Sequence, residues 1–131
     1  MKISIETNTY SVYSRGDNKL KKVILDSDAI SISTISLGEL YLGFKEGSKE
    51  SENLEKLKVF LSDIKVRISK INPETSRHYS NIKYALRRKG DLIPENDIWI
   101  AASALETDTT LVTYDRHFLK VPGLKLWKGL K

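Results

Sequence analysis

The chain has 131 residues, a mass of 14.9 kDa and a formal net charge of +5 at pH 7, which suits one domain spanning residues 1–131. It contains no cysteine, which excludes disulfides, thiol catalysis and a zinc–thiolate site. The longest apolar run, residues 98–105, is far shorter than the ~20 residues of a membrane span, and no signal peptide opens the chain, so a cytoplasmic protein without membrane contact is expected.

The chain opens with a strand-like run followed by a helix-like one. Residues 2–5 alternate polar and apolar side chains and lead into Glu6, after which Thr7 or Asn8 is placed to cap a short helix. Apolar side chains then recur on one face of residues 17–25, which predicts an amphipathic helix.

The second strand-like run, residues 30–33, also meets a helix-start signal. Ser36 and Glu39 have the S-x-x-E spacing of a capping box, which predicts Glu39 in the first turn of a helix. The polar residues 44–51 are typical of a loop, and the spacing in 52–64 predicts another amphipathic helix.

A third strand is expected over residues 66–71, followed by a long helix. Asn72 is its expected cap, Pro73 its first residue and Gly90 its stop. Cations on its polar side are candidates for contacts with RNA phosphates, or else they only complement the helix dipole. They are Arg77, Lys83, Arg87 and Arg88.

The last third of the chain repeats the alternation of strand and helix. Residues 98–105 are apolar on all sides and predict a buried helix, with Asn96 near its N-cap and Asp97 at its positive end. Residues 110–113 predict a strand, and Asp115 is placed to cap the short turn that follows.

Four acids stand where a strand-like run gives way to a helix, and we call them the acidic set: Glu6, Glu39, Asp97 and Asp115. A helix-capping role explains any one of them. Because the carboxyl ends of parallel strands line one crevice, however, all four are expected to converge. Carboxylates suit Mg²⁺ or Mn²⁺, and a basic body suits a polyanion, so the pattern predicts metal-assisted attack of water on a phosphodiester.

The histidines and tryptophans give weaker evidence of function. His78 and His117 lack the spacing of a metal-binding pair and are interpreted as structural. Trp99 and Trp127 are interpreted as core or subunit-contact residues rather than as platforms for base stacking.

Two long runs, residues 90–105 and 111–118, closely resemble the PIN-domain toxins of VapBC toxin–antitoxin systems, as do Glu6-Thr7-Asn8 and residues 35–40. The resemblance covers essentially the whole chain in the family's order. It implies a three-layer α/β/α sandwich with a mainly parallel sheet. It also implies an endoribonuclease toxin that depends on Mg²⁺ or Mn²⁺, acts on structured RNA such as tRNA or ribosomal RNA loops, forms a homodimer and is neutralised by a VapB-like antitoxin.

The resemblance also assigns roles to residues. The acidic set would be catalytic and metal-binding, with Glu6 and Asp97 holding the metal most directly and the other two binding its waters or a second ion. Asn8 and Thr113 would orient these carboxylates by hydrogen bonds.

One position departs from the family, whose first motif is Asp-Thr-Asn. Glu6 carries its carboxylate one methylene further from the backbone, and a displacement of about 1 Å can cost roughly 10²-fold in rate. The exchange is either a natural adaptation or a change that weakens the toxin. A catalytically impaired protein that binds RNA or sequesters antitoxin is therefore an alternative. A receiver-like phosphoacceptor is disfavoured, because the late strand ends in Thr113-Tyr114-Asp115 without the required Lys.

Overall fold

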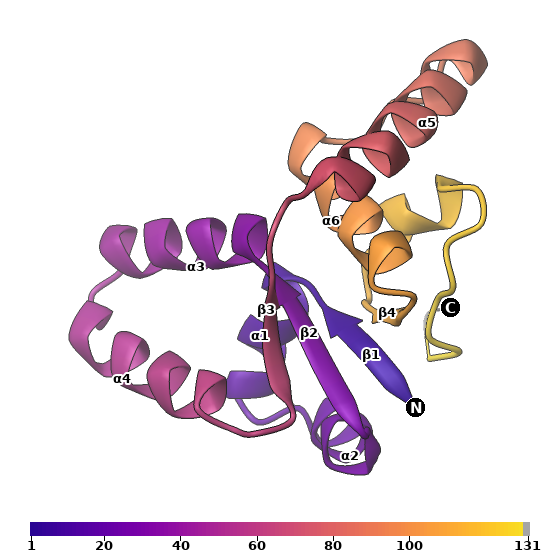
Figure 1. The fold of residues 1–131 in the computed structure, drawn as a ribbon. Coiled ribbons are helices and arrows are strands. Elements are labelled where there is room, and N and C mark those ends of the chain that lie inside the picture. The colour runs from indigo at the N-terminus through magenta and orange to yellow at the C-terminus, as the bar shows by residue number, and fades with distance from the viewer. Residues whose placement is uncertain (130–131) are drawn as a thin grey trace.

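The computed structural model describes residues 1–129, so the last two residues of the expected domain lie outside the described part. Its centre is a sheet of parallel strands in the order β3-β2-β1-β4 (Figure 1). The strands are β1 (Lys2–Ile5), β2 (Ala29–Ser33), β3 (Val66–Ser69) and β4 (Thr110–Val112). The predicted α/β class and parallel sheet are confirmed.

Helices cover both faces of this sheet and create two cores. One core is built with α1 (Thr7–Ser14), α2 (Asn18–Asp26), α3 (Thr34–Glu46) and α4 (Glu50–Leu61). The other is built with α5 (Pro73–Lys89), α6 (Glu95–Glu106) and the 3-10 turn η1 (Arg116–Lys120). The three-layer α/β/α sandwich is therefore confirmed, with the outer half of α5 projecting beyond the sheet (Figure 1).

The two faces of the sheet differ in side-chain size. Ile3 and Ile5 of β1 point into the core of α1 to α4, whereas the intervening Ser4 hydrogen-bonds Thr109 on the side of α6. Helix α6, which covers this face, also carries small buried residues, including Ala101. Small side chains on both sides bring the helix close to the strands, because packed interiors leave few voids.

One expected helix start is wrong, and a second helix begins slightly earlier than expected. The cap of α3 is Ser33, whose hydroxyl accepts from the Ser36 N–H at 3.1 Å, so Glu39 lies in the second turn and the capping box does not form. Ser33 wins because its extended backbone at the end of β2 already presents the hydroxyl to the new helix. Helix α6 begins at Glu95, directly after its N-cap Pro94, which forms no side-chain cap hydrogen bond; Asn96 lies near the N-cap, as expected, but is not itself the cap.

The boundaries near α4 also shift. The expected loop over residues 44–51 shrinks, because α3 continues to Glu46 and α4 starts at Glu50, and α4 ends at Leu61 rather than at residue 64. Charged side chains do not oppose a helix when its apolar face is buried, and Leu57 buries that face here.

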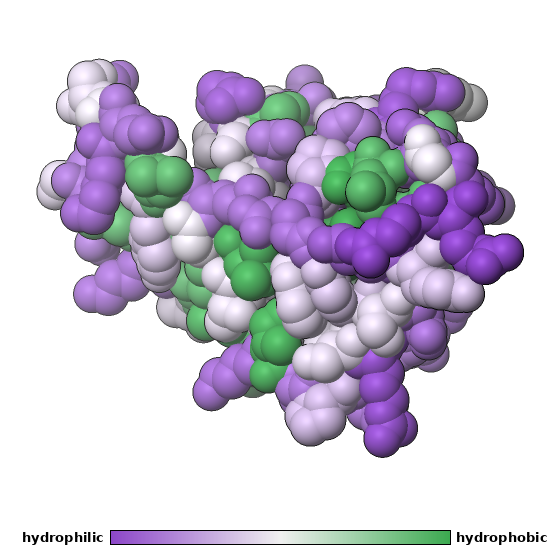
Figure 2. Space-filling model, turned by 90° about the horizontal axis from the view of Figure 1, so that it is seen from above, coloured by the Kyte–Doolittle hydropathy of each residue, from purple (hydrophilic) through white to green (hydrophobic). Residues whose placement is uncertain are grey.

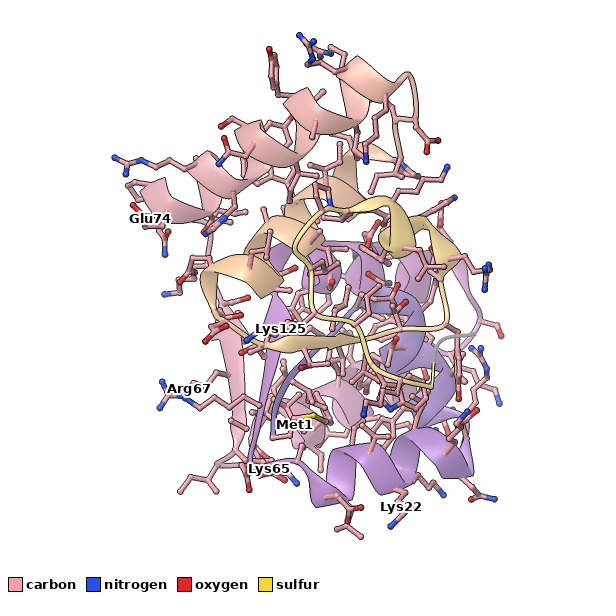
Figure 3. The ribbon with its side chains drawn as sticks, turned by 90° about the vertical axis from the view of Figure 1, so that its right-hand side faces the viewer. Met1, Lys22, Lys65, Arg67, Glu74 and Lys125 are labelled. Atoms are coloured by element: carbon pink, nitrogen blue, oxygen red, sulfur yellow. The ribbon has the colours of Figure 1, made fainter. Side chains whose placement is uncertain are left out.

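The start and stop of α5 are confirmed. Asn72 and Thr75 form a reciprocal capping box, Pro73 is the first helical residue, and Gly90 ends the helix at a φ of 67°, where glycine carries no Cβ penalty. A carbonyl group in the last turn of α2 is paired with a residue far along the chain, because the Lys65 ammonium donates to the Ile24 carbonyl at 2.7 Å (Figure 3). No helix within residues 1–129 is long and apolar enough to cross a membrane.

Candidate active site

The acidic set gathers at the carboxyl edge of the sheet. Glu6 follows β1, Asp97 lies in the first turn of α6, and Asp115 follows β4. Glu39 reaches the same edge from α3. Their charges lie close enough to interact. Besides burial, the carboxylates of Asp97 and Asp115 raise the pKa of Glu6, and those of Asp115 and Glu39 raise the pKa of Asp97.

Glu6 is the most deeply buried member. Its residue is 3% exposed, and its carboxylate accepts the backbone N–H of Thr9, which makes Glu6 itself the N-cap of α1. The expected caps Thr7 and Asn8 are therefore wrong. The Glu6 carboxylate thereby satisfies one of the N–H groups that lack a partner at the start of the helix. Burial raises the pKa of Glu6 to about 7, although the Thr9 hydrogen bonds oppose this rise.

This raised pKa predicts a pH-dependent stability. The folded chain holds the Glu6 proton more tightly than the unfolded chain, so the stabilisation is complete below pH 4.5 and is lost as pH rises to about 7. At about 1.4 kcal/mol per pKa unit, the loss is about 3 kcal/mol. We expect Glu6→Gln, which keeps an acceptor for Thr9, to be about 3 kcal/mol more stable than the natural chain at pH 8 and equal to it at pH 4, in urea unfolding without metal. Parallel pH profiles for the two chains would contradict this.

A histidine completes the other half of the site. His117 Nδ1 lies 3.2 Å from Asp97 Oδ2 and 3.3 Å from Asp115 Oδ1. Asp115 also caps η1, as predicted, by accepting the His117 N–H at 2.9 Å. Burial raises the pKa of Asp97, while the hydrogen bond to His117 opposes the rise. His117 therefore lies among the acids of the site rather than apart from them, and the sequence signal for this was the Asp115-x-His117 spacing within one turn.

Glu39 is held by two residues that the sequence did not single out for this role. The Thr7 hydroxyl donates to one of its oxygens, and Asn96 Nδ2 donates to the other at 3.2 Å. These bonds fix the carboxylate at the rim of the site. The signal for both was their position next to a member of the acidic set.

The two residues expected to orient the carboxylates lie differently. The Thr113 hydroxyl is buried and accepts the Asp115 N–H at 2.9 Å, so it orients Asp115 through the backbone. Asn8 is exposed, and within residues 1–129 no hydrogen bond joins it to the acidic set.

The cations of α5 are partly committed to nearby acids. Arg77 pairs with Glu74 at 3.2 Å, near the outer edge of the molecule (Figure 3). Lys83 pairs with Glu95 at 2.8 Å. Arg88 packs on the Tyr84 ring, and Arg87 is exposed.

The donor set fits a divalent cation. One ligand atom each from Asp97, Asp115 and His117 lie within 4.8 Å of one another. Carboxylate oxygens suit Mg²⁺ and Mn²⁺, and imidazole nitrogen suits first-row transition metals. Burial is the main cause of the raised pKa values of Glu6 and Asp97, and the charges of the neighbouring carboxylates add to it; a bound cation would offset both effects.

Known proteins share this fold and this chain pattern. Residues 6–124 match the PIN domain family. The chain is 31% identical over 128 residues to ribonuclease VapC2 of Haemophilus influenzae, covering 95% of this chain and 96% of the relative. It is 32% identical over 106 residues to ribonuclease VapC2 of Rickettsia felis, covering 80% and 78%. It is 25% identical over 129 residues to the tRNA(fMet)-specific endonuclease VapC of Salmonella typhimurium, covering 96% of each.

Solved structures agree. VapBC2 from Rickettsia felis, bound to a DNA fragment from its promoter, superposes with a TM-score of 0.85 at 29% identity, over 97% of this chain and 98% of that one. VapBC-1 from nontypeable Haemophilus influenzae, at 21% identity, shows the shared fold with a TM-score of 0.86 over 97% of each chain. The sequence match and the fold are those of a PIN domain. The chain belongs to the VapC ribonucleases within that family.

Proposed function

We propose that the protein is an endoribonuclease toxin that depends on Mg²⁺ or Mn²⁺ and cleaves a structured RNA. The observation that carries this proposal is the gathering of the acidic set at one edge of the sheet, in a chain whose net charge is nevertheless +5. Basic surface favours a phosphate backbone, and the acidic edge favours the ion that phosphodiester chemistry uses.

The chain's own residues would divide the work. Glu6 and Asp97, joined by Asp115, would hold the metal, which supplies charge neutralisation at the phosphate and acidifies a water. Glu39, held by Thr7 and Asn96, would position water and substrate at the rim. No Ser or Cys nucleophile is required for this reaction.

Incubation with total RNA tests the proposal. The purified protein should cleave RNA with Mg²⁺ or Mn²⁺ and should not cleave it in their absence. Cleavage that survives an excess of chelator would contradict the metal dependence. Absence of cleavage with either ion, by a chain that still binds RNA, would favour the impaired alternative below.

The RNA class and the partner are proposed from the relatives. The Salmonella typhimurium relative is named for a tRNA, so a tRNA or ribosomal RNA loop is the proposed substrate, met in the cytoplasm. The Rickettsia felis structure is a VapBC complex, so a VapB-like antitoxin is the proposed partner of a homodimeric toxin. On α5, RNA contact is proposed for Arg87 and Arg88, since within residues 1–129 neither forms an ion pair.

A second candidate function rests on Glu6. Its carboxylate is buried and committed to capping α1, which leaves it poorly placed to bind a metal. On this alternative the chain binds RNA or sequesters antitoxin without cleaving. The Glu6→Asp variant described in the Discussion separates the two functions.

A further inference from the structure

His117 faces two carboxylates with a spacing that suits a shared metal. Its Nδ1 is 3.2 Å from Asp97 Oδ2 and 3.3 Å from Asp115 Oδ1. Neighbouring ligands of an octahedral ion are about 3.0 Å apart when each bond is about 2.1 Å. Without an ion the same spacing is that of a hydrogen bond. The imidazole therefore stands where a nitrogen ligand would stand.

Within residues 1–129, the His117 ring makes polar contacts with the carboxylates of Asp97 and Asp115 and with no other side chain. The His117 side chain is 47% exposed, and its N–H backbone bond to Asp115 fixes the turn rather than the ring. Ordering an exposed side chain costs conformational freedom, and a solvated hydrogen bond returns little of it. A metal ion shared with Asp97 and Asp115 would order the ring more strongly.

We infer that His117 is a protein ligand of the active-site metal and that it makes the site prefer Mn²⁺ to Mg²⁺. This inference rests on the proposed metal-dependent function. Mg²⁺ strongly prefers oxygen, whereas imidazole is a good ligand for first-row transition ions, among which Mn²⁺ also accepts carboxylates. A mixed nitrogen and oxygen set therefore favours Mn²⁺.

Mn²⁺ binding to the whole protein, measured by electron paramagnetic resonance and calorimetry, tests the inference. The natural chain should bind Mn²⁺ with nitrogen hyperfine coupling from one imidazole. His117→Gln should lose that coupling and weaken Mn²⁺ binding by about 10-fold or more, with a smaller change for Mg²⁺. The matched control is His78→Gln on α5, which should leave both unchanged.

Each outcome has a distinct meaning. Mn²⁺ binding without nitrogen coupling, or unchanged affinity in His117→Gln, would overturn the role of His117 as a metal ligand and leave the proposed function standing. No binding of Mn²⁺ or Mg²⁺ by the natural chain would overturn both. Loss of affinity in His117→Gln without prior nitrogen coupling would make His117 a positioning residue for Asp97 instead of a ligand.

A second inference comes from a groove beside the acidic set. It has a volume of about 590 Å³ and runs between α1, α3 and α4, with Glu39 and Thr7 at one end. Seen from above, the α3–α4 end projects as a separate lobe with a notch between it and the main body (Figure 2). The groove is thus continuous with the rim of the active site.

Three cations line this groove, namely Arg15, Lys49 and Lys56. Within residues 1–129 none of them forms an ion pair, in contrast to Arg77 and Lys83 of α5. The other lining includes the polar side chains of Thr7, Asn8, Ser11, Ser14 and Asn53, with Phe44 as the aromatic member. Free cations, hydroxyls and one ring are the groups that bind phosphates, sugars and bases of a single strand.

We propose that this groove binds the single-stranded RNA segment next to the scissile phosphate. The proposal deepens the ribonuclease function and rests on it. An acidic peptide is the competing occupant, but a peptide would not need continuity with Glu39. Fluorescence anisotropy of a labelled RNA oligonucleotide in chelator measures binding without cleavage.

The triple variant Arg15→Gln, Lys49→Gln, Lys56→Gln should bind RNA more weakly, and its plot of log affinity against log salt should be shallower by about 2, at about 0.7 per lost phosphate contact. Lys58→Gln, an exposed cation of α4 outside the groove, is the control. An unchanged slope in the triple variant, or an equal loss in the control, would overturn the proposal. So would loss of binding to a poly-glutamate peptide but not to RNA. If the natural chain fails to bind RNA at all, the proposed function fails with it.

Discussion

Asp97→Asn is expected to reduce RNA cleavage by at least about 100-fold while the protein stays folded. The side chain faces His117 at 3.2 Å and carries a charge that would bind the metal, so neutralising it removes a ligand oxygen and the pull on the cation. Initial rates on RNA with saturating Mn²⁺ measure the effect. Glu46→Gln, an exposed acid at the end of α3, is the control and should keep full activity.

The Asp97→Asn variant should be at least as stable as the natural chain when no metal is present. Burial raises the pKa of Asp97 above its ordinary 3.8, so the stabilisation present below that pH is lost as pH rises through the folded value. At pH 7 the ionised carboxylate is a net cost, which Asn removes. A variant that unfolds, or one that cleaves normally, would show that Asp97 serves the fold rather than the chemistry.

Glu6→Asp is expected to raise cleavage by up to about 100-fold. Aspartate is a preferred N-cap and reaches the helix N–H groups with a shorter arm, so it can cap α1 while returning the carboxylate towards the family's usual position. Toxicity on induction in a bacterial host should rise in parallel. Single-turnover rates at saturating Mn²⁺ separate this gain from tighter RNA binding.

The matched control shortens a different arm of the site. Glu39→Asp withdraws the carboxylate from Thr7 and Asn96 and should lower cleavage, so a gain from shortening is expected at Glu6 alone. If Glu6→Asp is equal to or slower than the natural chain, the longer side chain is an adaptation and the impaired alternative fails.

The features predicted correctly from sequence depend on local signals or on topology. Asn72, Pro73 and Gly90 delimit α5 because each acts within one turn. The edge on which the acidic set lies follows from a parallel sheet, whose strands all end on one side. The prediction of a helix cap failed where two candidate residues lie three positions apart, as with Ser33 and Ser36, because the end of the preceding strand determines which of them caps the helix.

What the sequence could not show depends on contacts between distant elements. His117 meets Asp97 only after η1 has packed beside α6, and no periodicity encodes that meeting. The pairing of Lys83 with Glu95 similarly depends on how α5 lies against α6. Whether a cation is free to meet RNA is therefore a tertiary property rather than a compositional one.

The small buried side chains of α6 make the proposed activity sensitive to substitutions in the core. Ala101, Ala102 and Ala104 are fully buried, and α6 touches β2 and β4 while carrying Asp97 in its first turn. An added methyl group there would lift the helix and, with it, the Asp97 carboxylate at the carboxyl edge of the sheet. A core substitution too mild to unfold the chain would therefore still lower the proposed rate of RNA cleavage. The buried alanines of α6 thus set the position of the helix and of the carboxylate that it carries.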